Sequence, residues 1–175
     1  MTYHVRFDCG EAYRRDRLRY RPAHLAQLTG LRTDGRVVAA GPEPDGYRAH
    51  IFYRVASLGE LGLLLADNVF YRAGLFTGHL ARRFTQAVEP VELPPVDAGL
   101  KAMIVEGTPS DVESARAGLA VLQRAGRLAI GGILEDGAAL AVVRSSDPDE
   151  AREWVRKAGG WQGPGLTARP WSQTL

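Results

Sequence analysis

The residues best suited to chemistry are a histidine and an arginine on one face of an expected helix. Leucines recur at helical spacing from Leu18 to Leu31, which predicts a helix over about residues 15–34. With Leu18 set at 0°, His24 falls at about 240°, inside the apolar sector, and Arg21 at about 300°. A histidine there can act as an acid or a base near neutral pH, and Arg21 can hold an anionic or enolate oxygen. Two alternatives stay open: a half-buried structural role for His24 and a surface ion pair for Arg21.

Other residues with chemical potential form weaker patterns. His50 and His79 fall in expected strands and are candidate ligand-contacting residues. Neither belongs to a metal-ligand spacing such as HExxH, so the sequence predicts no metal site. Gly131-Gly132 lacks the spacing of a phosphate-binding loop and is expected in a tight turn, and no cofactor is predicted. The single Cys9 excludes an intrachain disulfide, which makes the cytoplasm the expected compartment.

Length and charge restrict the class of protein. The chain has 175 residues, of which 45% are hydrophobic, enough for one ordinary domain or two small ones. The net charge of +2 is too small to indicate nucleic-acid binding. We expect the arginine-rich run between Arg14 and Arg21 to be a solvated face. No apolar run approaches the roughly 20 residues of a membrane-spanning helix, so we expect neither nucleic acid nor membrane as a partner.

An internal repeat organises the chain. The segment Gly35–Gly41 matches Gly126–Gly132 at an offset of 91 residues. Each half carries signals of strand, helix, strand, strand, helix and strand, which is the ferredoxin-like arrangement. We therefore predict an α+β protein of two tandem ferredoxin-like units, residues 1–90 and 100–175, joined by a proline-rich linker over residues 91–99.

The expected sheets each have one face to bury. A ferredoxin-like unit carries both helices on one face of its sheet and leaves the other face bare. Two copies in one chain can cover these faces by packing them against each other. The repeat therefore predicts an intrachain pseudo-dimer, and a homodimer is a further assembly that the sequence leaves open.

Start and stop signals place the elements within each half. Ser57 and Glu60 have the spacing of a capping box. Thr108-Pro109 predicts an N-cap followed by the first helical residue, and Gly35 is expected to end the first helix. The expected strands are residues 3–8, 36–40, 47–56, 75–88, 100–106, 127–130, 138–144 and 166–172, and the expected helices are residues 15–34, 57–66, 109–126 and 147–157.

Two separated motifs in the first half resemble a known family. The stretch Arg21-Pro22-Ala23-His24-Leu25, followed by Gly35-Arg36 and Ala40-Gly41-Pro42, resembles the signature of the YciI-like (YCII-related) family. The segment from Asp67 to Phe76 resembles its second motif. The resemblance covers residues 1–90 and reaches residues 100–175 only through the repeat.

This resemblance implies a fold and a site. It implies a dimeric α+β barrel built from ferredoxin-like units, which here would form as a barrel-like pseudo-dimer within one chain. It also implies an active site built on His24 and Asp67, in which Asp67 would fix the tautomer of His24 and favour its protonated form. For most members of the family the substrate is unknown.

The second copy departs from the family's pattern. At an offset of 91, His24 falls on Ala115, and at an offset of 89, Asp67 falls on Arg156. We therefore expect the first half to hold the functional site and the second to act as a scaffold. Because Ala115 stands in the repeat, His24→Ala is expected to leave folding nearly intact.

Two functions of different class remain open. One is a small cofactor-independent enzyme that uses a His/Asp acid–base pair on a small polar or anionic metabolite. The other is a non-catalytic small-ligand-binding or assembly module. Either would take a small molecule as its partner.

Overall fold

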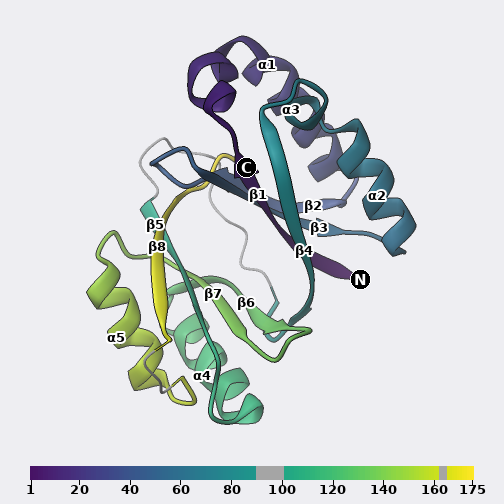
Figure 1. Cartoon of the computed structure of the whole chain (residues 1–175). Helices are drawn as coiled ribbons and strands as arrows, with labels where there is room; N and C mark the ends of the chain where they lie inside the picture. The colour runs from purple at the N-terminus through teal and green to yellow at the C-terminus, as the bar shows by residue number, and fades with distance from the viewer. Residues whose placement is uncertain (90–100, 162–164) are drawn as a thin grey trace. The chain divides into compact units, whose positions relative to one another are not determined.

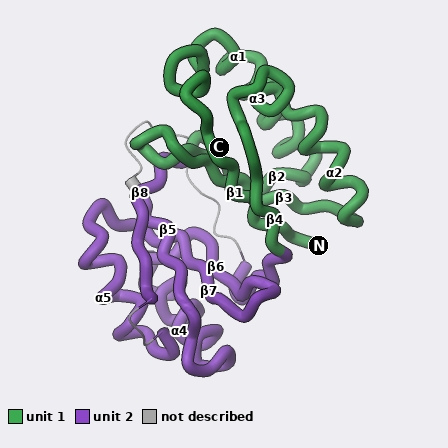
Figure 2. Tube along the Cα trace, in the orientation of Figure 1, with its two compact units in different colours: residues 1–82, 174–175 green, residues 83–173 purple. Residues whose placement is uncertain are grey.

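The chain divides into two compact units. The computed structural model describes residues 1–89, 101–161 and 165–175, and the expected linker over residues 91–99 lies outside these ranges. The first unit comprises residues 1–82 and 174–175, and the second comprises residues 83–173 (Figure 2). The division falls inside a strand rather than at the expected linker.

The first unit has ferredoxin-like topology with one additional short helix. Its strands follow the hydrogen-bonded order β2-β3-β1-β4, and β1 and β2 both pair antiparallel with β3. The helices cover one face of these strands (Figure 1). The elements are β1 (Thr2–Cys9), α1 (Glu11–Thr33), β2 (Val37–Pro42), β3 (Arg48–Arg54), α2 (Leu58–Asp67), α3 (Val69–Arg72) and β4 (Phe76–Gln86).

The second unit repeats this topology. Its strands follow the order β6-β7-β5-β8, and the last residues of β4 pair with β6. Both helices pack on one face of these strands (Figure 1). The elements are β5 (Lys101–Gly107), α4 (Val112–Arg124), β6 (Leu128–Leu134), β7 (Ala139–Val143), α5 (Pro148–Ala158) and β8 (Thr167–Ser172). The predicted α+β class and the order of elements are thus observed, whereas common descent of the units and their barrel-like pairing stay predictions.

Helix ends follow the signals in the sequence in most places. The Ser57 hydroxyl accepts a hydrogen bond from the Glu60 amide at 3.1 Å, as a capping box requires. Gly35 has a φ of +73°, the left-handed conformation expected just after a helix. The prediction at Pro109 is wrong, because α4 begins at Val112 and its N-cap is Asp111.

One further prediction, the tight turn at Gly131-Gly132, is corrected by the structure. Gly131 and Gly132 lie inside β6 rather than in a turn. A Cβ on Gly132 would stand 2.7 Å from the Phe84 ring, and one on Gly131 would stand 2.8 Å from a Leu119 methyl group. Glycine is therefore needed in this strand for the close approach of neighbouring side chains rather than for a turn.

Helix α1 is longer than expected, and its buried face is narrower. It begins at Glu11 and contains Pro22. Its buried residues lie between about 220° and 280° on the helical wheel, a sector that includes His24 but not Leu18. Leu18 is accordingly 74% exposed. The buried residues are Tyr13, His24, Leu28 and Leu31.

Alternation along β1 gives the first sheet two distinct faces. Tyr3, Val5 and Phe7 belong to the core beneath the helices. His4, between them, therefore points to the opposite face, where it is also fully buried. No helix among the described residues is long and apolar enough to cross a membrane.

Candidate functional site

His24 is a buried, neutral imidazole on the helix side of the first unit. It is 7% exposed, and its ring stacks on that of Phe70 with 3.8 Å between centroids. Burial lowers the pKa of His24 from 6.5 to about 4. Within the described residues its Nδ1 atom makes no hydrogen bond. The ring is therefore uncharged at neutral pH and keeps one nitrogen for a further hydrogen bond.

Asp67 ends α2 and bonds to groups other than His24. Its carboxylate accepts a hydrogen bond from Gln27 Nε2 at 3.2 Å and another from Arg72 at 3.3 Å. Gln27 also donates to the Asp67 carbonyl oxygen at 2.8 Å and accepts from the Val69 amide. Gln27 therefore binds the α2–α3 junction to α1, one turn after His24.

The expected contact between His24 and Asp67 is not made directly. Among the described residues, no hydrogen bond or ion pair joins the two side chains, and the Asp67 side chain is 70% exposed. The lowered pKa of His24 is also opposite to the rise expected beside a carboxylate. A catalytic role of the His24/Asp67 pair, with the two side chains joined through one water, stays a prediction.

The remaining predicted groups around α1 are accounted for more simply. Arg21 is exposed on α1, and its role as an anion-binding residue stays a prediction. Burial raises the pKa of the Cys9 thiol to about 12, so the thiol stays protonated and weakly nucleophilic. His79 is exposed, and its Nδ1 lies 3.4 Å from the Tyr71 hydroxyl.

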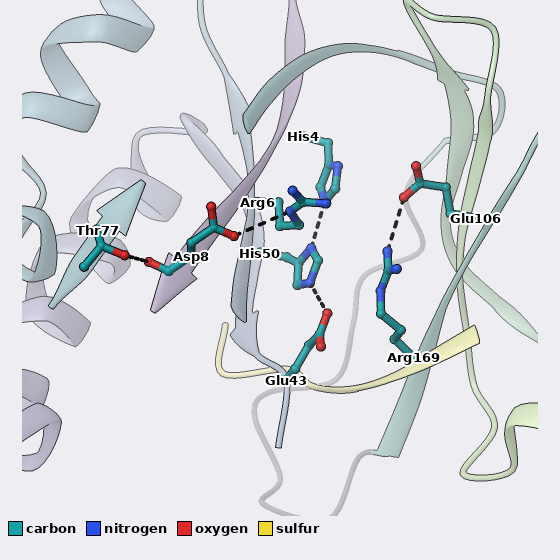
Figure 3. A network of polar contacts seen from close by, with 8 residues as sticks. All are labelled: His4, Arg6, Asp8, Glu43, His50, Thr77, Glu106 and Arg169. Carbon is teal, nitrogen blue, oxygen red and sulfur yellow. Dashed lines mark hydrogen bonds and ion pairs between the residues drawn. The ribbon is translucent and has the colours of Figure 1, made fainter. Parts of the chain in front are cut away.

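The opposite face of the first sheet carries a continuous chain of titratable side chains. His4 Nε2 lies 3.0 Å from His50 Nδ1, and His50 Nε2 lies 3.0 Å from Glu43 Oε1. Figure 3 shows the three side chains in a row, from β1 through β3 to the segment after β2. Both histidines are 0% exposed and Glu43 is 5% exposed. We call these three residues the Glu43–His50–His4 relay.

With Glu43 ionised and both histidines neutral, one arrangement of protons satisfies both hydrogen bonds of the relay. An ionised Glu43 only accepts, so His50 must donate from Nε2. A neutral His50 then accepts at Nδ1, and His4 must donate from Nε2, which leaves the lone pair of His4 on Nδ1. The two rings are parallel to within 7°. That alignment suits a hydrogen bond running in the ring planes.

The relay can take up one proton without losing either hydrogen bond. A proton added at His4 Nδ1 allows the proton on His4 Nε2 to pass to His50 Nδ1. The positive charge then resides on His50, 3.0 Å from the Glu43 carboxylate. Placing the charge beside its counter-ion offsets part of the cost of burying it. This is the arrangement by which a carboxylate supports a histidine base.

Arg6 lies beside the relay on the same sheet face. It is two residues from His4 on β1 and directly opposite His50 in the register of β1 and β3. Its nearest carboxylate is that of Asp8, whose oxygen lies 4.0 Å from Arg6 Nε, too far for a hydrogen bond. Arg6 Nε is buried and makes no hydrogen bond within the described residues.

Sequence reasoning placed His50 in a strand but did not find the relay. Alternation places His4 on the face away from the helices, but it does not specify which residue of another strand lies beside it. The register supplies that information by pairing His4 with Phe52, two residues from His50. Within the described residues, no three or more His, Cys, Asp or Glu side chains are arranged to hold a metal ion.

Comparison with known proteins supports the fold and leaves the family open. No family model matches the sequence, and no curated protein matches it either. A proposed monooxygenase from Lactobacillus acidophilus has a TM-score of 0.64 and 11% identity, over 99% of this chain and 93% of its own. A proposed monooxygenase from Fusobacterium nucleatum has a TM-score of 0.63 and 8% identity, over 99% of this chain and 92% of its own.

A third solved structure matches only part of the chain. It is a 5-chloro-2-hydroxyhydroquinone dehydrochlorinase from Burkholderia phenoliruptrix in complex with 2,5-dihydroxybenzoquinone. Its TM-score is 0.44 and its identity 20%, over 49% of this chain and 94% of its own. At these identities the likenesses show the fold alone, and for the two full-length matches that fold extends over both units.

Proposed function

We propose that the first unit is a small cofactor-independent acid–base enzyme acting on a small polar or anionic metabolite. The observation that carries this proposal is the Glu43–His50–His4 relay. Its two 3.0 Å hydrogen bonds give a proton a continuous route from His4 Nδ1 toward a buried carboxylate. Membership of the YciI-like family is part of the proposal and rests on the two sequence motifs.

The relay suits proton abstraction better than His24 does. An imidazole that stays neutral down to about pH 4 is a weak base at neutral pH. A histidine linked to a carboxylate is a stronger base, because the carboxylate stabilises the imidazolium that forms. Glu43 supplies that carboxylate to His50, and His50 extends its effect to His4.

Hydrogen–deuterium exchange at carbon tests the proposal without a known substrate. An acid–base enzyme that removes a proton from carbon returns a deuteron in D2O. We would follow that exchange by proton NMR in a panel of small hydroxyketones, keto acids and 1,3-diketones. We expect the wild-type protein to accelerate exchange in one chemical class, and Glu43→Gln to slow it about a hundredfold. If the protein accelerates exchange in none of these chemical classes, the proposal that it is an acid–base enzyme is rejected.

A second candidate function is non-catalytic binding of a small planar ligand at His24. The observation that favours it is the buried Nδ1 atom without a hydrogen bond, on a ring that stacks against Phe70. A ligand hydroxyl could donate to this nitrogen, and Arg21 could attract a ligand anion at the surface. In the exchange assay His24→Phe is the matched control. Loss of exchange in His24→Phe with normal exchange in Glu43→Gln would move the catalytic site to His24. Absence of exchange in the wild-type protein would leave non-catalytic binding as the candidate function.

A further inference from the structure

Arg6, which lies next to the relay, indicates which class of molecule the relay deprotonates. We propose that Arg6 holds the conjugate base of a neutral weak acid, a phenol or an enol, while the Glu43–His50–His4 relay keeps the proton. This inference rests on the proposed function, because it assigns the substrate class of the same site. The argument combines an unsatisfied donor, a register and a charge balance.

The unsatisfied donor is Arg6 Nε. A buried guanidinium N–H without an acceptor is costly, since it has lost water and gained no partner. The Asp8 carboxylate does not compensate for it, because it lies 4.0 Å away and is 54% exposed. An oxygen anion at this nitrogen would form the charge-assisted hydrogen bond that is missing.

The register places this donor within reach of a ligand that also touches the relay. Arg6 faces His50 across the strand pair, and His4 is the next residue on the same face of β1. The Arg6 side chain is 28% exposed, whereas both histidines are fully buried. Among the relay and Arg6, therefore, Arg6 has the greatest access to solvent. Figure 3 shows its side chain beside the two imidazole rings.

The charges of the site favour a neutral acid over a preformed anion. At rest, Glu43 carries a negative charge at one end of the relay, and Arg6 carries a positive charge beside it. If a neutral acid loses its proton to His4 Nδ1, the O–H bond breaks and an N–H bond forms. The electron pair stays on the ligand oxygen beside Arg6. The new negative charge lies beside Arg6 and the new positive charge beside Glu43, so the transfer adds no net charge to the site.

Proton uptake and anion binding should therefore assist each other. The cation of Arg6 disfavours a second positive charge on His50 until an anion neutralises it. Each event then lowers the cost of the other, and such coupling is reciprocal. Asp8 and Arg48 lie farther along the same face of β1 and β3, opposite each other in the register. Arg6 is the cation directly opposite His50.

A coloured weak acid, 4-nitrophenol, serves as the probe. Its absorbance distinguishes phenol from phenolate, so the spectrum reports where the proton goes. We expect the full-length protein to bind it as phenolate below the solution pKa of the probe. Calorimetry in buffers of different ionisation enthalpy should show that the protein, not the buffer, keeps the proton.

Substitutions at Arg6 test the anion contact directly. Arg6→Met keeps much of the volume without the charge, and should weaken phenolate binding about ten- to a hundredfold. Arg6→Lys keeps the charge without the Nε donor, and should restore part of the loss. Neither change alters a relay side chain. Arg6→Met removes the cation that disfavours a charged His50, so its histidine ring resonances should show easier protonation, whereas Arg6→Lys should keep the wild-type pattern.

The outcomes separate this inference from the proposed function. If Arg6→Met no longer binds phenolate and Glu43→Gln no longer catalyses exchange at carbon, both the Arg6 anion site and the acid–base role of the relay are supported. Equal binding by the wild-type protein and Arg6→Met, or no binding of the probe, overturns the assignment of Arg6, and the exchange assay then decides the relay alone. Binding of phenolate with the proton released to buffer in the wild-type protein overturns the relay as proton acceptor but keeps Arg6 as an anion site.

Discussion

The two units place different side chains at equivalent points of the same strand register. In the first unit, His50 on β3 lies opposite Gly41 on β2. In the second, Leu140 on β7 lies opposite Gly132 on β6. The same correspondence holds on the neighbouring strands and in the hairpin turns. The equivalent pairs, first unit and then second, are His4 and Ile104, Glu43 and Leu134, and His50 and Leu140.

The difference between the two units shows which side chains the sheet face opposite the helices requires. The three side chains in the second unit are apolar and buried, so the topology is satisfied without any titratable group there. The relay in the first unit is therefore not a demand of the fold. Buried polar networks carry desolvation costs that an apolar set avoids. A role in chemistry or binding explains why the first unit departs from the apolar solution.

The largest effect should come from breaking the relay in the middle. His50→Leu removes the donor to Glu43 and the acceptor of His4 together, while copying the residue of the second unit. Because single losses from buried charged networks are costly, we expect a loss of about 4 kcal/mol in the free energy of unfolding. Urea denaturation at pH 7 measures it.

The matched control copies the whole apolar set. The triple variant His4→Ile, Glu43→Leu and His50→Leu removes all three members of the relay together and should recover most of that loss. If the triple variant is as unstable as His50→Leu alone, the two faces are not interchangeable and the comparison between the units fails.

The next effect concerns His24, whose equivalent in the second unit is Ala115. The native pKa of His24 is about 4 and the unfolded value is 6.5. Between these pH values the unfolded state binds more protons, so the fold loses stability as pH falls from about 6.5 to 4. The loss attributable to this group reaches about 3 kcal/mol at its lower limit.

A phenylalanine at position 24 isolates this contribution. His24→Phe keeps a ring against Phe70 and cannot titrate, so it should match the wild-type stability at pH 7 and exceed it increasingly toward pH 4. Urea unfolding of both proteins across that range gives the difference, in which other titrating groups cancel. A constant difference across the range would show that His24 is not buried neutral in the folded protein.

The same comparison corrects the expectation for His24→Ala. The sequence predicted little effect on folding, because the repeat carries Ala115 at that position. His24 fills space against Phe70 and Phe76, however, and its removal leaves a cavity there. His24→Ala should therefore destabilise the fold by about 2 kcal/mol, whereas His24→Phe should not. The alanine variant is thus a poor probe of function.

The reverse substitution should also be harmful, for a reason specific to the second unit. Ala115 is fully buried on α4. Gly160 packs closely against the Ala115 backbone, because a Cβ added to Gly160 would stand 2.8 Å from the Ala115 Cα. Ala115→His would overfill this contact and bury a polar ring, at a cost of about 2 kcal/mol. Thermal unfolding measures it. A stability unchanged from the wild type would mean that α4 can move away from Gly160.

Local patterns predicted most of the fold. Alternation located β1, the capping box at Ser57 located α2, and the repeat around Gly35 predicted a second copy of the same element order. Helix α3 was missed because its four residues are too few to show a period. Its start is set by Asn68, whose side chain accepts hydrogen bonds from two following amides.

The candidate site was less predictable because it depends on contacts between distant segments. The relay requires the pairing of β1 with β3 and the turn that brings Glu43 to His50. Local sequence patterns do not predict which residues these two contacts bring together. The contact of Gln27 with Asp67 likewise joins two helices. A helical wheel shows that His24 is buried but not what it stacks on.

The smallest predicted effect on stability concerns the N-caps of α1 and α4, the first helices of the two units. Helix α4 begins at Asp111, whose carboxylate accepts hydrogen bonds from the Ser114 amide at 2.8 Å and the Glu113 amide at 3.3 Å. Helix α1 begins after Gly10, which provides no side-chain cap. Removing the cap with Asp111→Ala should therefore cost about 1 kcal/mol, and Asp111→Gly only a few tenths.

Adding a cap to the first unit with Gly10→Ser should stabilise the fold by less than the Asp111 cap does, because β4 passes close to the start of α1. A Cβ on Gly10 would stand 2.7 Å from the Thr77 methyl group. Gly10→Ser adds a capping hydroxyl but must displace that methyl, so the gain and the strain should largely cancel. Combining it with Thr77→Ser, which removes the methyl and keeps the hydroxyl bonded to Asp8, should release the gain of a few tenths of a kcal/mol by which a serine cap exceeds a glycine cap. Urea midpoints of the single and double variants measure both. Full stabilisation by Gly10→Ser alone would show that the glycine cap reflects no steric difference between the units.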